Sequence, residues 1–190
     1  MDTTHKVIVA EFITLDGVIE DPDGTWGSPR GGWAMKHGPH VFAGDKFQLR
    51  SIMETGSLLF GRGTWQAFAE RWPRRTGDFA DAMNAARKLV ASSTLLDASA
   101  WANSSILDGR ITDAVRRARE DGDVALIGSP TLAHHLASEG LVDEYRLLVM
   151  PEVVGVGLRL FPEGRQEALS LLSSEVTEVG PLLKYAVLPG

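Results

Sequence analysis

Cysteine is absent from the sequence, which excludes a disulfide framework, a thiolate zinc site and a cysteine nucleophile. No run approaches the roughly 18 apolar residues of a membrane span, and the N-terminal apolar stretch is too short for a signal peptide, so we expect a cytoplasmic protein without a membrane partner. Basic charge is also scarce, since 19 lysines and arginines stand against 25 acids. The basic cluster at residues 71–75 (RWPRR) is typical of a solvated loop, so we expect no nucleic-acid partner.

The five histidines are poorly spaced for a metal site. His134 and His135 are adjacent, and on a helix they would point about 100° apart. The sequence contains no His-Glu-x-x-His pattern, and no acidic partner follows the histidines at ligand spacing. It also contains no Gly-x-Ser-x-Gly elbow. We therefore expect neither a metal centre nor a serine hydrolase.

The chain has 190 residues, and we assign residues 1–190 to one domain. Apolar and β-branched runs predict strands at 6–14, 57–60, 88–91, 124–127 and 142–150. Amphipathic or capped segments predict helices at 41–55, after Thr64, and at 79–86, 111–120 and 131–138. Two apolar runs within 169–188, parted by Gly180-Pro181, predict an antiparallel hairpin. This order predicts a three-layer α/β fold: a mostly parallel sheet with helices on both faces and an antiparallel C-terminal hairpin.

Two predicted strand-to-helix junctions could hold phosphate groups, at 59–65 (LFGRGTW) and 127–131 (IGSPT). Glycines let the backbone approach a ligand, and amides at a helix N-terminus attract anions. Arg62 could add a bidentate phosphate contact and Thr64 a hydroxyl, while Ser129 is suited to the N-cap of the next helix. Each junction could also be an ordinary loop closure, and the Rossmann glycine pattern is missing. The residues alone thus indicate a nucleotide-binding α/β protein.

Several segments, taken in order, resemble the dihydrofolate reductase superfamily. They are residues 13–19 (ITLDGVI), 58–65 (LLFGRGTW), 88–93 (KLVASS), 125–129 (ALIGS), 141–147 (LVDEYRL) and 151–161 (PEVVGVGLRLF). The chain is most similar to the branch that contains the C-terminal reductase domain of riboflavin biosynthesis and its stand-alone relatives. The resemblance implies a dihydrofolate-reductase-like fold and an NADPH-dependent reductase that acts on a small pterin-like, pyrimidine-like or related heteroaromatic molecule. It also implies a homodimer, with contacts near residues 142–150 and the C-terminal hairpin.

The resemblance implies roles for individual residues. Arg62 with Ser92 and Ser93 would hold the adenosine 2′-phosphate, and Thr64, Gly128 and Ser129 would cradle the pyrophosphate. The positions expected beside the nicotinamide are Val9, Ala10, Gly17 and Ile19. From the two junctions we add Gly61 and Thr131 to the cofactor site. Classical folate reductases have Gly-Gly at Gly128-Ser129, so the serine points away from true folate reduction.

The proton-donating group is less sharply defined. Hydride transfer to a C=N bond needs a protonated or hydrogen-bonded nitrogen, which a buried carboxylate can stabilise. In folate reductases that carboxylate lies in the first helix, and Asp45 occupies a matching place here, although it could equally be a surface residue beside Lys46. Glu11 and Asp16 are further acids near the same sheet edge, and Asp-Gly is above all a turn signal.

For the substrate pocket we name Trp33 and Phe42, since aromatic side chains in the long loop could stack on a ring. Phe47 is more typical of the core. A riboflavin-pathway substrate would also need a phosphate-binding group, for which the sequence offers Arg30, Arg50 and Arg71. Two alternatives stay open: a non-catalytic NADPH-binding dimer and a flavin-dependent reductase.

Overall fold

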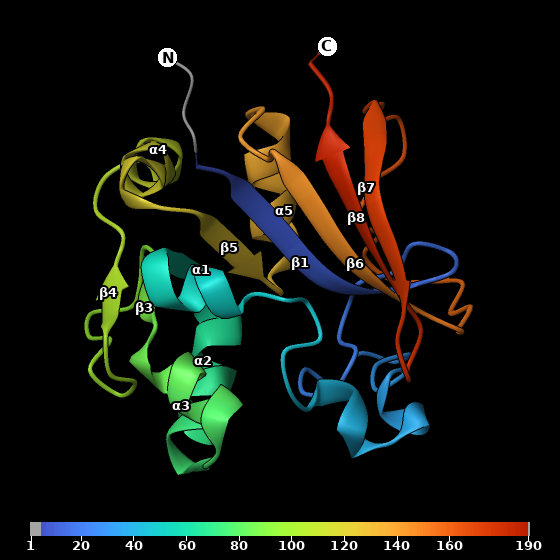
Figure 1. The fold of residues 1–190 in the computed structure, drawn as a ribbon, viewed down its shortest axis with the longest axis horizontal. Coiled ribbons are helices and arrows are strands. Elements are labelled where there is room, and N and C mark those ends of the chain that lie inside the picture. The colour runs from blue at the N-terminus through green and yellow to red at the C-terminus, as the bar shows by residue number, and fades with distance from the viewer. Residues whose placement is uncertain (1–4, 190) are drawn as a thin grey trace.

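The computed structural model describes residues 5–189, which form a twisted sheet between two layers of helices (Figure 1). Within these residues the sheet has eight strands in the order β4-β3-β2-β5-β1-β6-β8-β7. The strands are β1 Val7–Thr14, β2 Ser57–Gly61, β3 Arg87–Ala91, β4 Ser104–Ile106, β5 Val124–Ile127, β6 Glu144–Met150, β7 Leu169–Val176 and β8 Pro181–Val187. Strands β1 to β6 are parallel to one another, whereas β8 runs antiparallel to both β6 and β7. The predicted mostly parallel sheet and its C-terminal hairpin are confirmed.

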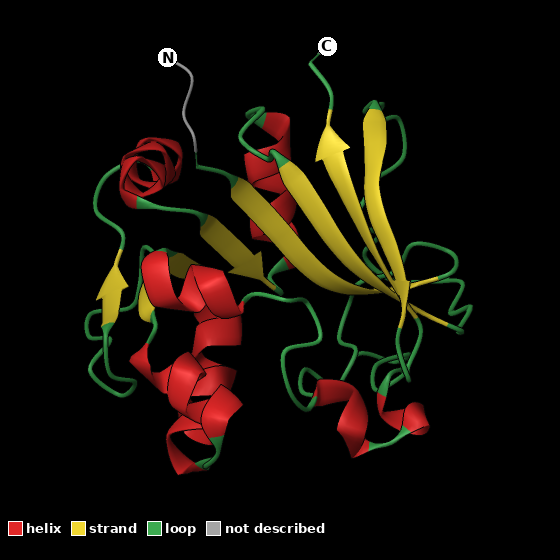
Figure 2. Ribbon diagram, in the orientation of Figure 1, coloured by secondary structure: helices red, strands yellow, loops and turns green. Residues whose placement is uncertain are grey.

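Helices cover both faces of the sheet, as predicted (Figure 2). On one face lie α1 Arg50–Thr55, α2 Arg62–Arg71 and α3 Asp78–Ala85, whose core is rich in aromatic side chains such as Phe60 and Trp101. On the other lie α4 Ile111–Asp121 and α5 Pro130–Ser138, packed on an aliphatic core that includes Val9 and Leu136. Short 3-10 helices lie at η1 Met35–His37, η2 Pro39–Phe42 and η3 Trp72–Arg74. No helix in the described part of the chain is long and apolar enough to cross a membrane.

The predicted helix at 41–55 is wrong in its first half. Only Arg50–Thr55 is α-helical, and Gly44 and Gln48 adopt positive φ angles of 72° and 55°. Asp45 lies in this loop, where its Oδ1 and Oδ2 accept the backbone N–H groups of Leu49 (2.7 Å) and Arg50 (2.8 Å). Side-chain bonds of this kind compete with helix formation, and here they fix the start of α1 instead.

Two smaller predictions about the strand-to-helix junctions also need correction. The helix after β2 begins at Arg62, with Gly61 at its N-cap, so Thr64 lies inside the first turn and does not cap it. Ser129 occupies the N-cap position of α5 as predicted, but its side chain makes no capping bond to that helix. Both side chains are thereby left to contact other groups.

The order in which the chain adds strands to the sheet changes direction between β1 and β5. From β1 it passes through α1 on one face to β2, which lies beyond β5. From β5 it passes through α5 on the opposite face to β6, which lies beyond β1. In open α/β sheets, ligands bind outside the carboxyl ends of strands at such a switch point. In Figure 1 the long segment between β1 and α1 lies against this edge.

Candidate functional site

The two glycine-containing junctions converge at the carboxyl edge of the sheet. The Gly61 N–H group donates a 2.8 Å hydrogen bond to Ser129 Oγ, and the Thr64 and Ser129 hydroxyls are 2.9 Å apart. Gly128 adopts a φ of 64°, and a Cβ on it would lie 3.1 Å from Thr64 Cγ2. A side chain at this position would therefore be strained by the backbone and crowded by Thr64. Two residues 68 positions apart in the sequence therefore meet at one edge of the sheet.

An open groove runs over these junctions on the α5 side, with a volume of about 610 Å³. Four of the residues expected to bind the cofactor line it: Gly61, Thr64, Ser129 and Thr131. The starts of α2 and α5 both face this edge, so their free amide groups are available to an anion. Trp26 lies over Gly63, where a Cβ would come within 3.1 Å of its ring, and forms one wall of the groove.

The predicted 2′-phosphate residues lie at the ends of the neighbouring strands β2 and β3. Arg62 is exposed, and its Nη1 donates to Thr94 Oγ1 at 3.1 Å. Ser92 Oγ accepts the backbone N–H groups of Thr94 (3.2 Å) and Leu95 (2.9 Å), and Ser93 is exposed. Arg62 and Ser92 therefore both bond to Thr94, in the turn that follows β3.

An inner cavity of about 290 Å³ continues from the groove to the carboxyl ends of β1 and β5. The predicted residues that line it are Ala10, Ile19, Thr64, Gly128 and Ser129. Thr64 and Ser129 also line the groove, so the two spaces form one cleft. Val9, by contrast, is fully buried in the aliphatic core, and the Gly17 carbonyl accepts the Leu160 N–H in a turn. Neither of these two lines the cleft, so their assignment beside the nicotinamide is corrected.

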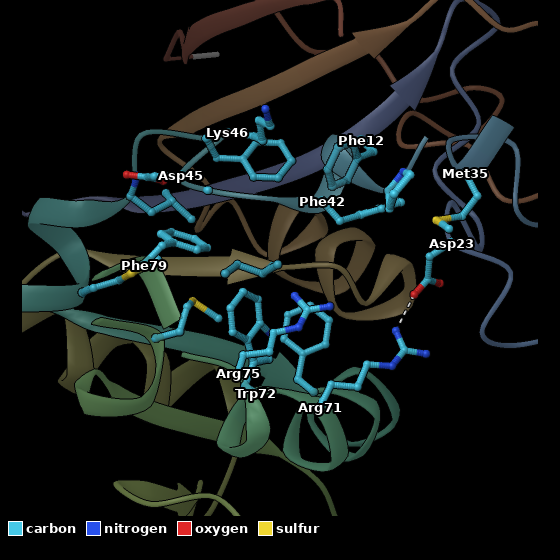
Figure 3. A pocket seen from close by; sticks show the side chains of 18 residues that line it. Phe12, Asp23, Met35, Phe42, Asp45, Lys46, Arg71, Trp72, Arg75 and Phe79 are labelled. Carbon is cyan, nitrogen blue, oxygen red and sulfur yellow. Dashed lines mark hydrogen bonds and ion pairs between the residues drawn. The ribbon is translucent and has the colours of Figure 1, made fainter. Parts of the chain in front are cut away.

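An aromatic pocket of about 350 Å³ lies at the same edge of the sheet, on the face that α1, α2 and α3 cover (Figure 3). Its aromatic walls are Phe12, Phe42, Phe47, Phe68, Trp72 and Phe79. Phe42 lines the pocket, and its ring centre lies 4.9 Å from that of Phe12. Trp33 does not, because it is 0% exposed and its Nε1 donates to the Glu20 carbonyl at 2.8 Å. The prediction that Trp33 binds substrate is therefore corrected: it belongs to the core.

Charged side chains surround the mouth of this pocket. Figure 3 shows Arg71 paired with Asp23, at 2.7 Å from Nη1 to Oδ2, while Arg71 Nη2 donates to Thr25 Oγ1. Burial raises the pKa of Asp23, but the hydrogen bonds from Thr25 and Arg71 outweigh burial and hold this pKa below its usual value. The Arg75 guanidinium lies 4.6 Å from the centre of the Trp72 ring. No local pattern in the sequence separates Arg75 from its basic neighbours.

The other candidate cations lie elsewhere. Arg50 pairs with Glu54 on α1, and Arg30 lines a separate small pocket beside Val154. Of the three arginines considered from the sequence, only Arg71 lines the aromatic pocket.

The three candidate acids have different surroundings. Asp45 lines the aromatic pocket, but both its oxygens accept backbone amides of α1. Asp16 stabilises a turn: the hydrogen bond from the Thr14 hydroxyl, aided by the amides of Val154 and Gly155, lowers its pKa to about 2. Glu11 is buried on β1 and lines the inner cavity, and burial raises its pKa well above the usual value. Glu11 is therefore the acid among the three that is not already held by hydrogen bonds from the described residues.

The sheet order, the antiparallel hairpin and a cleft at the switch point together define a dihydrofolate-reductase-like α/β domain. Within that class the chain belongs to the RibD C-terminal domain family, whose model matches residues 5–184. The family resemblance read from the sequence is thus confirmed. This family is the reductase part of riboflavin-biosynthesis enzymes.

Solved structures share the fold at low sequence identity. A putative riboflavin biosynthesis protein from Shewanella sp. PV-4 has a TM-score of 0.71 at 20% identity, over 97% of this chain and 99% of its own. Acinetobacter baumannii RibD has a TM-score of 0.64 at 16% identity, over 98% of this chain. The Thermotoga maritima diaminohydroxyphosphoribosylaminopyrimidine deaminase/5-amino-6-(5-phosphoribosylamino)uracil reductase has a TM-score of 0.60 at 15% identity, over 97% of this chain. The chain spans 59% and 57% of the latter two proteins. No curated protein matches its sequence.

Proposed function

We propose that the protein is a cytoplasmic NADPH-dependent reductase of a small heteroaromatic molecule. The observation that carries this proposal is the hydrogen-bonded meeting of the Gly61 and Ser129 turns. It produces one cleft that starts at two helix N-termini and ends beside an aromatic pocket. Membership in a family of riboflavin-biosynthesis reductase domains supports the same chemistry.

The residues of the cleft fit such a dinucleotide. Gly61 and Gly128 leave backbone exposed where a Cβ would fill the cradle, since it would lie 2.7 Å from Ser129 Oγ or 3.1 Å from Thr64 Cγ2. The amides of α2 and α5 would hold the pyrophosphate, and Arg62 with the Ser92 turn would hold the 2′-phosphate. Ala10 and Ile19 would face the nicotinamide. The bound cofactor would supply the hydride.

The aromatic pocket would hold the substrate. Phe42 and Trp72 can stack on a flat ring, and the basic rim formed by Arg71 and Arg75 favours a substrate with an anionic substituent. Because the inner cavity and this pocket share Phe12, Phe42 and Ile127, the two ligands would meet there. The protein would then act mainly by positioning them.

Binding of NADPH and NADH, measured by fluorescence titration, tests the proposal. We expect a clear preference for NADPH, and Arg62→Ala should weaken NADPH binding by about 10- to 100-fold while leaving NADH unchanged, because only NADPH carries the 2′-phosphate. Arg87→Ala is the matched control, since Arg87 begins β3 at the other sheet edge and pairs with Asp121. Equal affinity of the wild type for both nucleotides would contradict the 2′-phosphate assignment.

Oxidation of NADPH at 340 nm, with pterin, pyrimidine and nitro-aromatic compounds, tests the reductase activity. If NADPH binds with preference but no compound is reduced, the non-catalytic NADPH-binding protein becomes the better account. A yellow protein with a bound flavin would instead favour a flavin-dependent reductase.

We also propose that two copies associate through the C-terminal hairpin. β7 is one of the two edge strands of the described sheet and exposes Leu171, Leu172 and, at 88% exposure, Val176. Exposed apolar edge strands pair readily with another chain. Strand β6, also expected at the interface, lies inside the sheet with β1 and β8 on either side, so it cannot supply a free edge.

A further inference from the structure

Glu11 is a carboxyl group in a strand that is otherwise built from apolar residues and a threonine. The strand reads VIVAEFIT, and Glu11 is only 4% exposed. Its Oε1 is buried and has no hydrogen-bond partner among the described residues. Burying a polar group without a partner costs stability, so such a group is usually retained for a purpose beyond folding.

The position of Glu11 on β1 directs it toward the cleft. Ala10 and Phe12 pack on the aromatic face, so the alternation of the strand points Glu11 to the α5 face. Ala10 pairs with Ile127, the last residue of β5, whereas Glu11 pairs only with Leu147 of β6. Glu11 is thus the first β1 residue beyond the end of β5. It lines the inner cavity there, as do Gly128 and Ser129.

The ionisable side chains that line this cavity are all acidic. Its other ionisable lining residues are Glu20, Asp21 and Asp23. Each of them accepts hydrogen bonds: Glu20 from Leu158 N–H, Asp21 from Trp26 N–H, and Asp23 from Arg71.

Basic groups on the surrounding elements bond elsewhere. On α5, His134 Nε2 lies 2.6 Å from the Arg159 carbonyl oxygen, and Arg159 itself donates to the Asp16 carbonyl. His135 lines only the outer groove. Burial without a cation favours the protonated form of Glu11.

We propose that Glu11, as a neutral carboxylic acid, recognises the carboxamide of the nicotinamide ring in the inner cavity. A carboxylic acid offers one O–H donor and one carbonyl acceptor, and a primary carboxamide offers the complementary acceptor and donor. This inference rests on the proposed NADPH function and adds a specificity-determining residue to it. Ionised Glu11 would lose the donor.

The experiment compares two ligands and two variants. The ligands are NADPH and 2′-phospho-ADP-ribose, which lacks the nicotinamide ring, and the variants are Glu11→Gln and Glu11→Leu. We expect Glu11→Leu to bind NADPH about 10- to 100-fold more weakly and 2′-phospho-ADP-ribose unchanged. Glu11→Gln should stay close to the wild type, because its amide also offers a donor and an acceptor.

Two further measurements separate this role from a structural one. NADPH affinity of the wild type should fall as the pH rises through the pKa of Glu11, whereas the affinity of Glu11→Gln should stay flat over the same interval. Glu11→Leu should unfold at or above the wild-type temperature, because it removes an unpaired buried polar group.

The outcomes distinguish failure of the proposed function from failure of the Glu11 role. If the wild type binds neither ligand, the proposed function fails and the Glu11 inference fails with it. If the wild type binds both, but Glu11→Leu weakens both equally or neither, the proposed function stands and Glu11 does not recognise the carboxamide.

Discussion

Ser129 connects the two turns of the cleft through its hydroxyl group, and replacing it with alanine tests whether this connection stabilises the protein. Its Oγ accepts the Gly61 N–H at 2.8 Å and lies 2.9 Å from Thr64 Oγ1. Ser129→Ala leaves the Gly61 amide, in a partly buried place, without its acceptor. We expect a loss of about 1–3 kcal/mol in the free energy of unfolding, the usual cost of an unsatisfied buried donor.

The backbone of Ser129 allows a sharper comparison. Its φ of 64° is left-handed, which costs a residue with a Cβ roughly 1–2 kcal/mol. Ser129→Gly loses the same hydrogen bond but relieves that strain, so it should be more stable than Ser129→Ala by about 1 kcal/mol. We therefore expect the wild type to be the most stable, the glycine variant the next and the alanine variant the least. This order separates the contribution of the hydrogen bond from that of the backbone strain.

Gly61 gives a second variant for a double-mutant cycle. A Cβ on Gly61 would lie 2.7 Å from Ser129 Oγ, so Gly61→Ala should clash in the wild type and cost less once that oxygen is removed. We expect a coupling energy of about 0.5–3 kcal/mol between the two substitutions. Additive effects would contradict the direct contact between the two turns.

Urea unfolding, checked by thermal unfolding, measures these differences. For a domain of this size, the expected loss in Ser129→Ala corresponds to a fall of roughly 2–12 °C in the melting temperature. Ser138→Ala is the control on the same helix, since Ser138 is exposed and bonds only to the His135 carbonyl. If Ser129→Ala has the same free energy of unfolding as this control, water replaces the lost hydrogen bond and the contact between the two turns does not stabilise the fold.

Two further predictions concern the Asp16 turn and the β7 edge. The pKa of Asp16 is lowered from 3.8 to about 2, so its stabilisation is complete above pH 4 and is lost as the pH falls toward 2. Asp16→Asn should remove this part of the pH dependence of the free energy of unfolding in urea. Parallel plots of this free energy against pH for the wild type and the variant would refute the prediction. Leu171→Lys with Val176→Lys should convert the proposed dimer to a monomer in sedimentation equilibrium, whereas Val153→Lys, an exposed position off the hairpin, should not. A monomeric wild type would exclude the dimer.

The junction residues could be predicted because their signals are local. A short apolar strand, a glycine and a helix start follow one another at 57–64 and again at 124–131, and the structure has strands and helices at both places. That these junctions meet is a long-range fact. It depends on β5 lying between β1 and β2, which no local pattern in the sequence indicates.

The segment before α1 could not be predicted, for an identifiable reason. Its apolar residues are indeed buried, as Val41, Leu49 and Ile52 show, so the hydrophobic pattern was real. The backbone, however, is turned by positive φ angles at Gly44 and Gln48 and held by Asp45. Hydrophobic spacing reports which side chains are buried, but it does not report these side-chain bonds to the backbone.

Trp33 illustrates the same limit in the long loop. The loop folds back on itself because buried Asp21 accepts the N–H groups of Trp26 and Ser28. That turn places Trp33 in the core and leaves Trp26 at the cleft. A segment with no regular period gives no basis for choosing between the two tryptophans.

The distribution of charge along the cleft argues for one orientation of the ligand. Arg62 lies at the outer end, near the two helix N-termini, where phosphate groups would be stabilised. The inner cavity extends from Thr64, Gly128 and Ser129 to Glu20 and Asp21, whose carboxylates would repel the same phosphates. Hydride donation leaves positive charge on a nicotinamide ring, and these carboxylates would stabilise that charge. For the proposed NADPH, the electrostatics therefore favour an orientation with the phosphates outside and the nicotinamide ring inside, next to the aromatic pocket.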